Sequence, residues 1–264
     1  MNVTFEQLDA EHRSYKGISL SEEECREHLQ NAVKDNLLDR EEWQDSLNRL
    51  QALQEETGFI ANAGLIADIQ TLLNEEIELK QFRIGEAYAE IILEQEFVCR
   101  FHWNENRDAR NPRGNKTGAD LVGFTEVNGE VVFLFGEVKT SSETATRPPQ
   151  VMTYAEGIEK QLRDLYNDRN KRFILISYLK NKMRHYPDGH PFKIDFNASE
   201  RSYYSDTCNF QLYGVLVRDV ESDVKDLSAS YERLKNHILE PNGLKLLALY
   251  LPIRKEEWEN IINE

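Results

Sequence analysis

An acid and a lysine stand together at the end of an apolar strand, where a charged pair is costly unless it binds something. Glu137 and Lys139 end a run whose alternate members, Val131, Phe133 and Phe135, are apolar. Because side chains at i and i+2 of a strand point to the same face, the acid and the lysine project together from this apolar face. We therefore expect a ligand at the end of this strand.

A second acid, Asp120, opens the preceding strand. The two strand-like runs, Asp120–Val127 and Glu130–Val138, are joined by Asn128-Gly129. Such a pair is the strongest short hairpin signal, because both turn positions need positive φ. Pairing residues symmetrically about the turn sets Asp120 next to Glu137. Two adjacent carboxylates repel and raise each other's pKa unless a cation lies between them.

The paired carboxylates indicate a divalent metal. Hard oxygen ligands suit Mg²⁺ or Mn²⁺, which keep several waters and bind phosphate oxygens. Lys139 would then orient the attacking water or stabilise the charge that develops on the phosphate. The alternative is a surface ion pair at a strand end. Two further (D/E)-x-K triplets, Glu78-Leu79-Lys80 and Asp223-Val224-Lys225, fall in helix-like segments, where i and i+2 do not share a face.

These motifs resemble the core of the PD-(D/E)xK nuclease superfamily. Gly118-Ala119-Asp120, the hairpin and Gly136-Glu137-Val138-Lys139-Thr140 provide the resemblance, which covers about residues 82–180. It implies an α/β fold with a restriction-endonuclease-like mixed sheet (an αβββαβ core) and metal-dependent hydrolysis of phosphodiester bonds. It also implies Asp120 and Glu137 as metal ligands and Lys139 as the catalytic lysine. The proline that often precedes the aspartate in this superfamily is absent.

The helix before the core often supplies a further acid in these nucleases. Gly85-Glu86-Ala87-Tyr88-Ala89-Glu90 resembles that element. We take Glu86 as the further catalytic acid and metal ligand. Glu90, one turn later on the same helix face, is the second choice, and a solvated helix acid is the alternative for either residue.

The chain as a whole is similar to the HamA-type nuclease subunits of the Hachiman antiphage defence system. The points of similarity are its size, its helical lead, the Gly-Glu helix, and the segments 119–124 and 135–141. This resemblance implies a cytoplasmic bacterial defence effector that is held by a HamB-like helicase partner and degrades DNA when released. The rival interpretation is a nuclease-like fold that serves as a binding module without catalysis.

Periodicity and turn signals predict the elements that must position these residues. Helices are expected over Ser19–Leu53, Leu65–Leu79, Phe82–Glu96, Tyr154–Asp168, Ser222–Glu240 and after Arg254. Besides the hairpin, strands are expected over Phe97–Trp103, Phe173–Leu179, Phe210–Val217 and Leu244–Leu251. The order predicts a mixed sheet flanked by helices. We divide it into an acidic helical N-terminal region (1–80) and a nuclease domain with a C-terminal α/β extension (81–264).

The net charge of −15 is concentrated in the N-terminal third of the chain. Residues 1–99 hold 22 acids against 8 basic residues, whereas residues 100–264 hold 25 against 24. Two basic segments, Arg100–Lys116 and Arg169–Arg184, are therefore candidates for binding phosphates, and ordinary solvated surface is the alternative for each. DNA contacts are predicted at Arg110, Arg113, Lys116, Lys171 and Arg172. The acidic region would control the nuclease, bind a partner, or only keep the protein soluble.

Several other classes of protein do not fit the sequence. No apolar run approaches the roughly 18 residues of a membrane span, and the first ten residues lack the apolar core of a signal peptide. Three scattered cysteines indicate no disulfide framework. No P-loop is present, so ATP hydrolysis is not expected, and the histidines form no zinc spacing.

Overall fold

A six-stranded mixed sheet forms the centre of the molecule. The computed structural model describes residues 1–73, 80–104, 118–205 and 209–264. The strands are arranged in the order β1-β2-β6-β5-β4-β3. Their bounds are β1 (Asn2–Ala10), β2 (Arg13–Ser19), β3 (Leu121–Val127), β4 (Glu130–Thr140), β5 (Gln211–Arg218) and β6 (Gly243–Tyr250). The prediction of an α/β fold with a mixed sheet is confirmed.

The four central strands are parallel, and an antiparallel hairpin closes each edge. β2, β6, β5 and β4 run in the same direction, whereas β1 pairs antiparallel with β2, and β3 with β4. The carboxyl ends of the parallel strands therefore lie at one end of the sheet, where ligands bind in open α/β sheets. Glu137, Lys139 and Thr140 lie at this end of β4.

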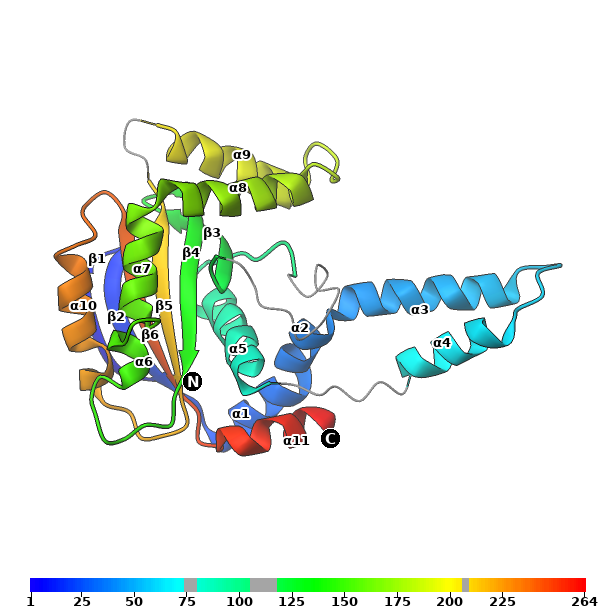
Figure 1. Ribbon diagram of the computed structural model, residues 1–264, viewed down its shortest axis with the longest axis horizontal. Coiled ribbons are helices and arrows are strands. Elements are labelled where there is room, and N and C mark those ends of the chain that lie inside the picture. The colour runs from blue at the N-terminus through cyan, green and yellow to red at the C-terminus, as the bar shows by residue number, and fades with distance from the viewer. Residues whose placement is uncertain (74–79, 105–117, 206–208) are drawn as a thin grey trace.

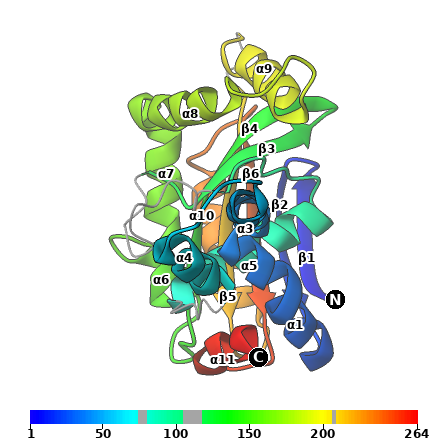
Figure 2. The same ribbon diagram turned by 90° about the vertical axis from the view of Figure 1, so that its right-hand side faces the viewer.

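Helices cover both faces of the sheet (Figure 1, Figure 2). One face packs against α1 (Glu22–His28), the π-helical turn η1 (Leu29–Val33), α5 (Gln81–Glu96) and α11 (Trp258–Asn263). The other packs against α6 (Gln150–Thr153), α7 (Ile158–Asn167), α8 (Arg169–Met183), α9 (Pro191–Tyr203) and α10 (Ser228–Lys235). Short elements are α2 (Lys34–Leu38), η3 (Val224–Asp226) and η4 (Lys255–Glu257). No helix within the described ranges combines the length and the apolar character needed to cross a membrane.

Two helices, α3 (Arg40–Glu55) and α4 (Ala63–Leu73), project from the sheet and its helices as an antiparallel pair (Figure 1). We call this pair the α3–α4 arm. At its base Trp43 Nε1 donates a hydrogen bond to Leu72 O (3.1 Å). Leu47 and Ile69 are buried, but other apolar side chains of the arm are exposed, among them Ile60 at 92%. The arm therefore has only a small core of its own.

The β3–β4 hairpin follows the predicted register. Asn128 and Gly129 have φ angles of 52° and 79°, the positive values that the turn requires. Val127 pairs with Glu130 and Leu121 with Gly136. Continuing this register by one residue sets Asp120 next to Glu137, so the predicted register of the hairpin is confirmed.

The N-terminal prediction was wrong in its first part. Residues 2–19, which include the start of the predicted helix at Ser19, form β1 and β2, and β2 lies inside the sheet between β1 and β6. The first helix begins after Ser21, whose side chain and Glu24 form a reciprocal capping box. The helix predicted through Leu53 is interrupted at Asp39, which has a left-handed φ of 47°. Residues 1–20 thus belong to the same sheet as the candidate site.

Three predictions further along the chain were also wrong. The segment Phe97–Trp103 forms no strand and contributes one isolated bridge, between Arg100 and Phe124. Phe173–Leu179 is not a strand but lies within the helix α8. Its β-branched and aromatic residues imitate a strand, but Phe173 and Ile174 are exposed while Leu175, Ile176 and Leu179 are buried, which is helical spacing. Ser222–Glu240 contains η3 and the short helix α10 in place of one long helix.

The two N-terminal features should differ in their importance for stability. Replacing residues 44–71 of the α3–α4 arm with a short Gly-Ser linker removes little shared core, and we expect the melting temperature to change by less than about 4 °C. Deleting residues 1–19 exposes the edge of β6 and removes Ile18, which is 1% exposed. We expect that deletion to abolish cooperative thermal unfolding, measured by circular dichroism. A folded protein lacking residues 1–19 would contradict this assignment of β2.

Candidate active site

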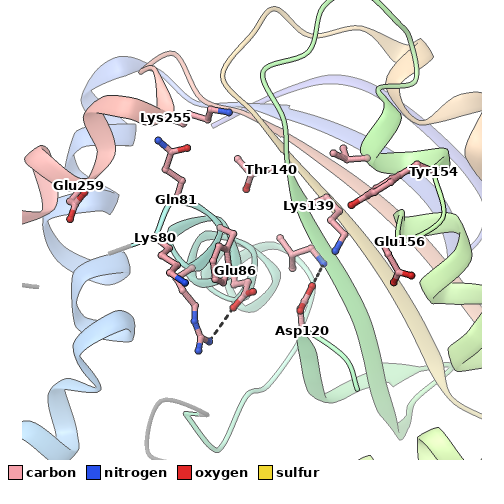
Figure 3. Close-up of a pocket in the computed structure, with 14 residues that line it drawn as sticks. Lys80, Gln81, Glu86, Asp120, Lys139, Thr140, Tyr154, Glu156, Lys255 and Glu259 are labelled. Atoms are coloured by element: carbon pink, nitrogen blue, oxygen red, sulfur yellow. Dashed lines mark hydrogen bonds and ion pairs between the residues drawn. The ribbon is translucent and has the colours of Figure 1, made fainter. Parts of the chain in front are cut away.

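Asp120 is held at the start of β3 by two backbone contacts. Its N–H donates to Gly136 O (3.0 Å). Its carboxylate Oδ2 accepts a hydrogen bond from the Val138 N–H (3.0 Å), as drawn in Figure 3. The pairing of β3 with β4 ends at Leu121 and Gly136. Beyond that point the Asp120 carboxylate, and not a main-chain carbonyl, accepts the hydrogen bond from β4. This contact fixes the carboxylate beside the residues on either side of Val138, which are Glu137 and Lys139.

Glu137 and Lys139 form a partly buried ion pair. Lys139 Nζ lies 2.6 Å from Glu137 Oε1, and the Glu137 side chain is 8% exposed. Burial and the neighbouring charge of Asp120 raise the pKa of Glu137 to about 7. Burial lowers the pKa of Lys139, but the contact with Glu137 more than offsets this effect, so the pKa is raised and the ammonium remains charged. The two carboxylates thus repel each other beside the Lys139 ammonium group.

A close approach of α5 to β4 brings a third acid to the site. A Cβ on Gly85 would lie 2.3 Å from Thr140 Oγ1, so the absence of a side chain at Gly85 lets the helix pack against the end of β4. Glu86, the next residue, is buried at 8% exposure, and its Oε2 lies 3.3 Å from Arg83 Nη1. Glu86 lines the pocket at this end of the sheet.

Glu90, the second choice for the helix acid, has a different environment. Its Oε2 accepts a hydrogen bond from Asn36 Nδ2 (2.9 Å), which ties α5 to the segment around α2. It does not line the pocket, whereas Glu86 does. The geometry therefore favours Glu86 over Glu90 as the acid that faces a ligand.

The pocket has a volume of about 910 Å³, within the size range of ligand sites. Figure 3 shows Asp120 and Lys139 on one side of the pocket and Glu86 and Lys80 on the other, and Arg83 is also part of the lining. Figure 3 shows Lys255 at one end, contributed by η4. Tyr154 and Glu156, from the loop between α6 and α7, complete the lining near Lys139. The site thus combines groups from five separate parts of the chain.

The donor set suits a hard divalent cation. Asp120 and Glu137 offer carboxylate oxygens, and the pKa of Glu137 is raised first by burial and then by the negative charge of Asp120, which a cation would offset. Among the described residues, no group of three His, Cys, Asp or Glu side chains is close enough to hold a metal ion. Two carboxylates are nevertheless sufficient for Mg²⁺, which keeps waters and takes phosphate oxygens as its other ligands. Glu86, the third predicted ligand, lines the pocket without completing such a group.

The predicted nucleic-acid contacts have three outcomes. Arg110, Arg113 and Lys116 lie outside the described residues. Lys171 Nζ donates to Gln161 Oε1 (3.0 Å), and its charge acts to lower the pKa of Glu137, so it lies toward the site. The prediction for Arg172 was wrong. Its guanidinium is buried and donates to Tyr203 Oη and to two carbonyl oxygens of α7, which makes it a structural residue of the core.

Other cations of the two basic segments also have acidic neighbours. Arg100 donates to Asp195 (2.7 Å) and to Glu126 (3.0 Å). Lys180 Nζ lies 3.0 Å from Glu200 Oε1. Counting the basic residues of a segment therefore overestimates the positive charge that is available to a phosphate.

Sequence reasoning missed most of the pocket lining. The charged and aromatic residues among those missed are Lys80, Phe82, Arg83, Tyr154, Glu156, Lys255 and Glu259. Tyr154 and Glu156 belong to a segment that was expected to be helical, and the chain there turns between α6 and α7. Lys255 follows Lys139 by more than a hundred positions, so no spacing rule relates the two residues. Only the parallel arrangement of β4, β5 and β6 brings them to the same end of the sheet.

The coupling between the two carboxylates is directly testable. Replacing Asp120→Asn removes the neighbouring negative charge and keeps an oxygen that can accept from the Val138 N–H. We expect the pKa of Glu137 to fall from about 7 toward its ordinary value. Carboxyl-carbon NMR titration of the metal-free protein measures this change, with Glu90→Gln as the control that leaves it unaltered. An unchanged Glu137 titration in Asp120→Asn would show that the two side chains do not interact.

Comparisons with known proteins add no assignment. No protein-family model matches the chain, and none of the curated proteins matches it either. The function is therefore inferred from Asp120, Lys139 and Glu86, which line the pocket, and from Glu137, which does not line it but lies beside Lys139.

Proposed function

We propose that the chain is a metal-dependent nuclease that hydrolyses DNA phosphodiester bonds. The observation that supports this most strongly is the hairpin register, which sets Asp120 beside Glu137 with Lys139 2.6 Å from the Glu137 carboxylate. Two hard oxygen ligands next to an ammonium group match the needs of phosphate chemistry. The motif resemblance to PD-(D/E)xK nucleases supports the same conclusion.

Asp120 and Glu137 would hold Mg²⁺ or Mn²⁺, and Glu86 would contribute from the opposite wall. When bound, the metal supplies Lewis-acid stabilisation of the phosphate and activates water. The Val138 N–H keeps the Asp120 carboxylate oriented. The Lys139 ammonium exchanges its contact with Glu137 for the substrate phosphate or for the attacking water. There it stabilises the negative charge that develops during hydrolysis.

The biological setting we propose is bacterial antiphage defence with a helicase partner. It rests on the resemblance to HamA-type subunits of the Hachiman system. The α3–α4 arm supports the existence of a protein partner, because Phe59, Ile60 and Leu73 expose apolar surface there. The rival function, a nuclease-like module that binds without cleaving, uses the same pocket and is separated from the proposal by a cleavage assay.

The helix acid can be tested with a matched pair of variants. Plasmid cleavage in Mg²⁺ is expected to fall at least about a hundredfold in Glu86→Gln, because a charged ligand is lost. Glu90→Gln, one turn away on the same helix, should retain activity close to wild type. Glu137→Gln and Lys139→Ala should be inactive, and EDTA should stop the wild-type reaction. Cleavage by Glu137→Gln at the wild-type rate would refute the mechanism, and a wild-type protein that binds DNA without cleaving it would favour the binding module.

Metal affinity should depend on pH in a defined direction. The pKa of Glu137 is raised to about 7 in the metal-free protein, and the carboxylate must lose its proton before it can bind a metal. Below pH 7 the dissociation constant for Mn²⁺ is therefore expected to increase about tenfold for each unit that the pH falls. Above pH 7 it should level off. Isothermal titration calorimetry between pH 5.5 and 8.5 measures this dependence, and a pH-independent affinity would exclude Glu137 as a ligand.

A further inference from the structure

Two aromatic side chains line the pocket and remain about half exposed. Phe82 is 48% exposed and Tyr154 is 47% exposed. Phe82 belongs to the first turn of α5, and Tyr154 follows α6, so the two rings come from different parts of the chain. Figure 3 shows Tyr154 extending toward Lys139, on the far side of the pocket from Lys80 and Gln81. Three of the candidate catalytic residues, Glu86, Asp120 and Lys139, therefore share their pocket with two incompletely buried rings.

Cations lie next to these rings. Lys80 Nζ lies 5.7 Å from the centre of the Phe82 ring. Arg83 Cζ lies 6.0 Å from it, and this guanidinium is also paired with Glu86 (3.3 Å). Lys139 lies near Tyr154, and Lys255 also lines the pocket. A ring with cations beside it offers a flat apolar surface and positive charge at the same place. This combination suits a ligand that is itself both flat and anionic.

A nucleic-acid strand with unpaired bases has this chemistry. Its bases stack on aromatic side chains while its phosphates lie against cations. In a duplex, by contrast, the base faces are covered by their neighbours, and sequence-independent affinity comes from phosphate contacts along the backbone. Among the described residues, Arg100 and Arg172 do not provide such contacts, because one is bonded to Asp195 and Glu126 and the other is buried.

We infer that the pocket binds single-stranded nucleic acid, with bases stacked on Phe82 and Tyr154 and the intervening phosphate directed to Asp120, Glu137 and Lys139. The inference rests on the proposed nuclease function for the role of these last three residues. It adds that the substrate is a single strand, or a duplex opened at the cleavage point. Phe82 and Tyr154 would then act as positioning residues that place the scissile bond.

Binding to a labelled oligonucleotide tests this inference without cleavage. The probes are oligothymidylate of about 12 nucleotides, an abasic strand of the same length, and the corresponding duplex. The binding protein is the full chain with Glu137→Gln, studied in Mg²⁺ by fluorescence anisotropy. Phe82→Leu and Tyr154→Leu are added singly, because leucine keeps apolar volume but removes the stacking face. Phe173→Leu is the matched control, since Phe173 is 57% exposed on α8 and does not line the pocket.

The expected result is tighter binding of oligothymidylate than of the abasic strand or the duplex. Each pocket substitution should weaken oligothymidylate binding at least about fivefold while leaving abasic binding unchanged, because each removes one stacked base. Phe173→Leu should change neither affinity, and thermal melts confirm that each variant is folded. Equal binding of oligothymidylate and the abasic strand would overturn the inference, as would a duplex that binds as tightly as the single strand.

Failure of this inference can be distinguished from failure of the proposed function. If the wild-type protein cleaves DNA in Mg²⁺ but the pocket substitutions weaken all probes equally, the stacking role is wrong and the nuclease assignment stands. If the protein cleaves nothing but binds oligothymidylate through Phe82 and Tyr154, the strand-binding inference stands and the nuclease assignment fails.

Discussion

The Asn128-Gly129 turn determines where the candidate active site of this protein lies. Because both residues adopt positive φ, the hairpin closes with two turn residues and a single register. A slip of one residue would send alternate side chains to the opposite face of the sheet. Glu137 would then exchange its position with Val138, which packs in the apolar core against α5. The carboxylate pair and its repulsion both follow from this one turn, and the metal site that we propose depends on it.

The position of β4 within the sheet explains why a pocket forms next to the hairpin carboxylates. One of its edges carries the hairpin, and the other pairs in parallel with β5. Its two faces pack against different helices, so Phe133 and Phe135 lie in one core and Leu134 and Val138 in the other. α5 can approach the end of the strand because Gly85 leaves room for Thr140. Glu86 from α5 and Asp120 from the hairpin therefore line the same pocket at this end of the sheet.

Sequence reasoning predicted the features that depend on residues close together in the sequence and missed those that depend on contacts between distant segments. The hairpin, its register and the helix with Glu86 depend on neighbours within a few positions, and the pattern shows them directly. β1 was not predicted, because an edge strand exposed on one side, such as Asn2–Ala10, has no clear apolar alternation. In α8 the run Phe173 to Ile176 resembled a strand, although the buried positions follow a helical period.

The burial of Arg172 is a different kind of miss, because its partners belong to α7 and α9. A count of basic residues cannot show whether a guanidinium group is exposed to solvent or buried among hydrogen-bond acceptors. The same holds for Tyr154 and Lys255, which reach the pocket only through the packing of the whole sheet. Contacts between distant segments decided these assignments, and no local pattern contains them.

The pairing of β2 with β6 has a consequence for how the protein is made. β2 comprises residues 13–19, and its parallel neighbour comprises residues 243–250. A ribosome adds residues one at a time, so β2 has no partner on that side until more than two hundred further residues have been synthesised. During that interval its edge needs protection from pairing with other chains. Until β6 is made, the β1–β2 hairpin cannot join the part of the sheet formed by β5, β4 and β3. A polypeptide whose synthesis stops before β6 therefore has a divided sheet.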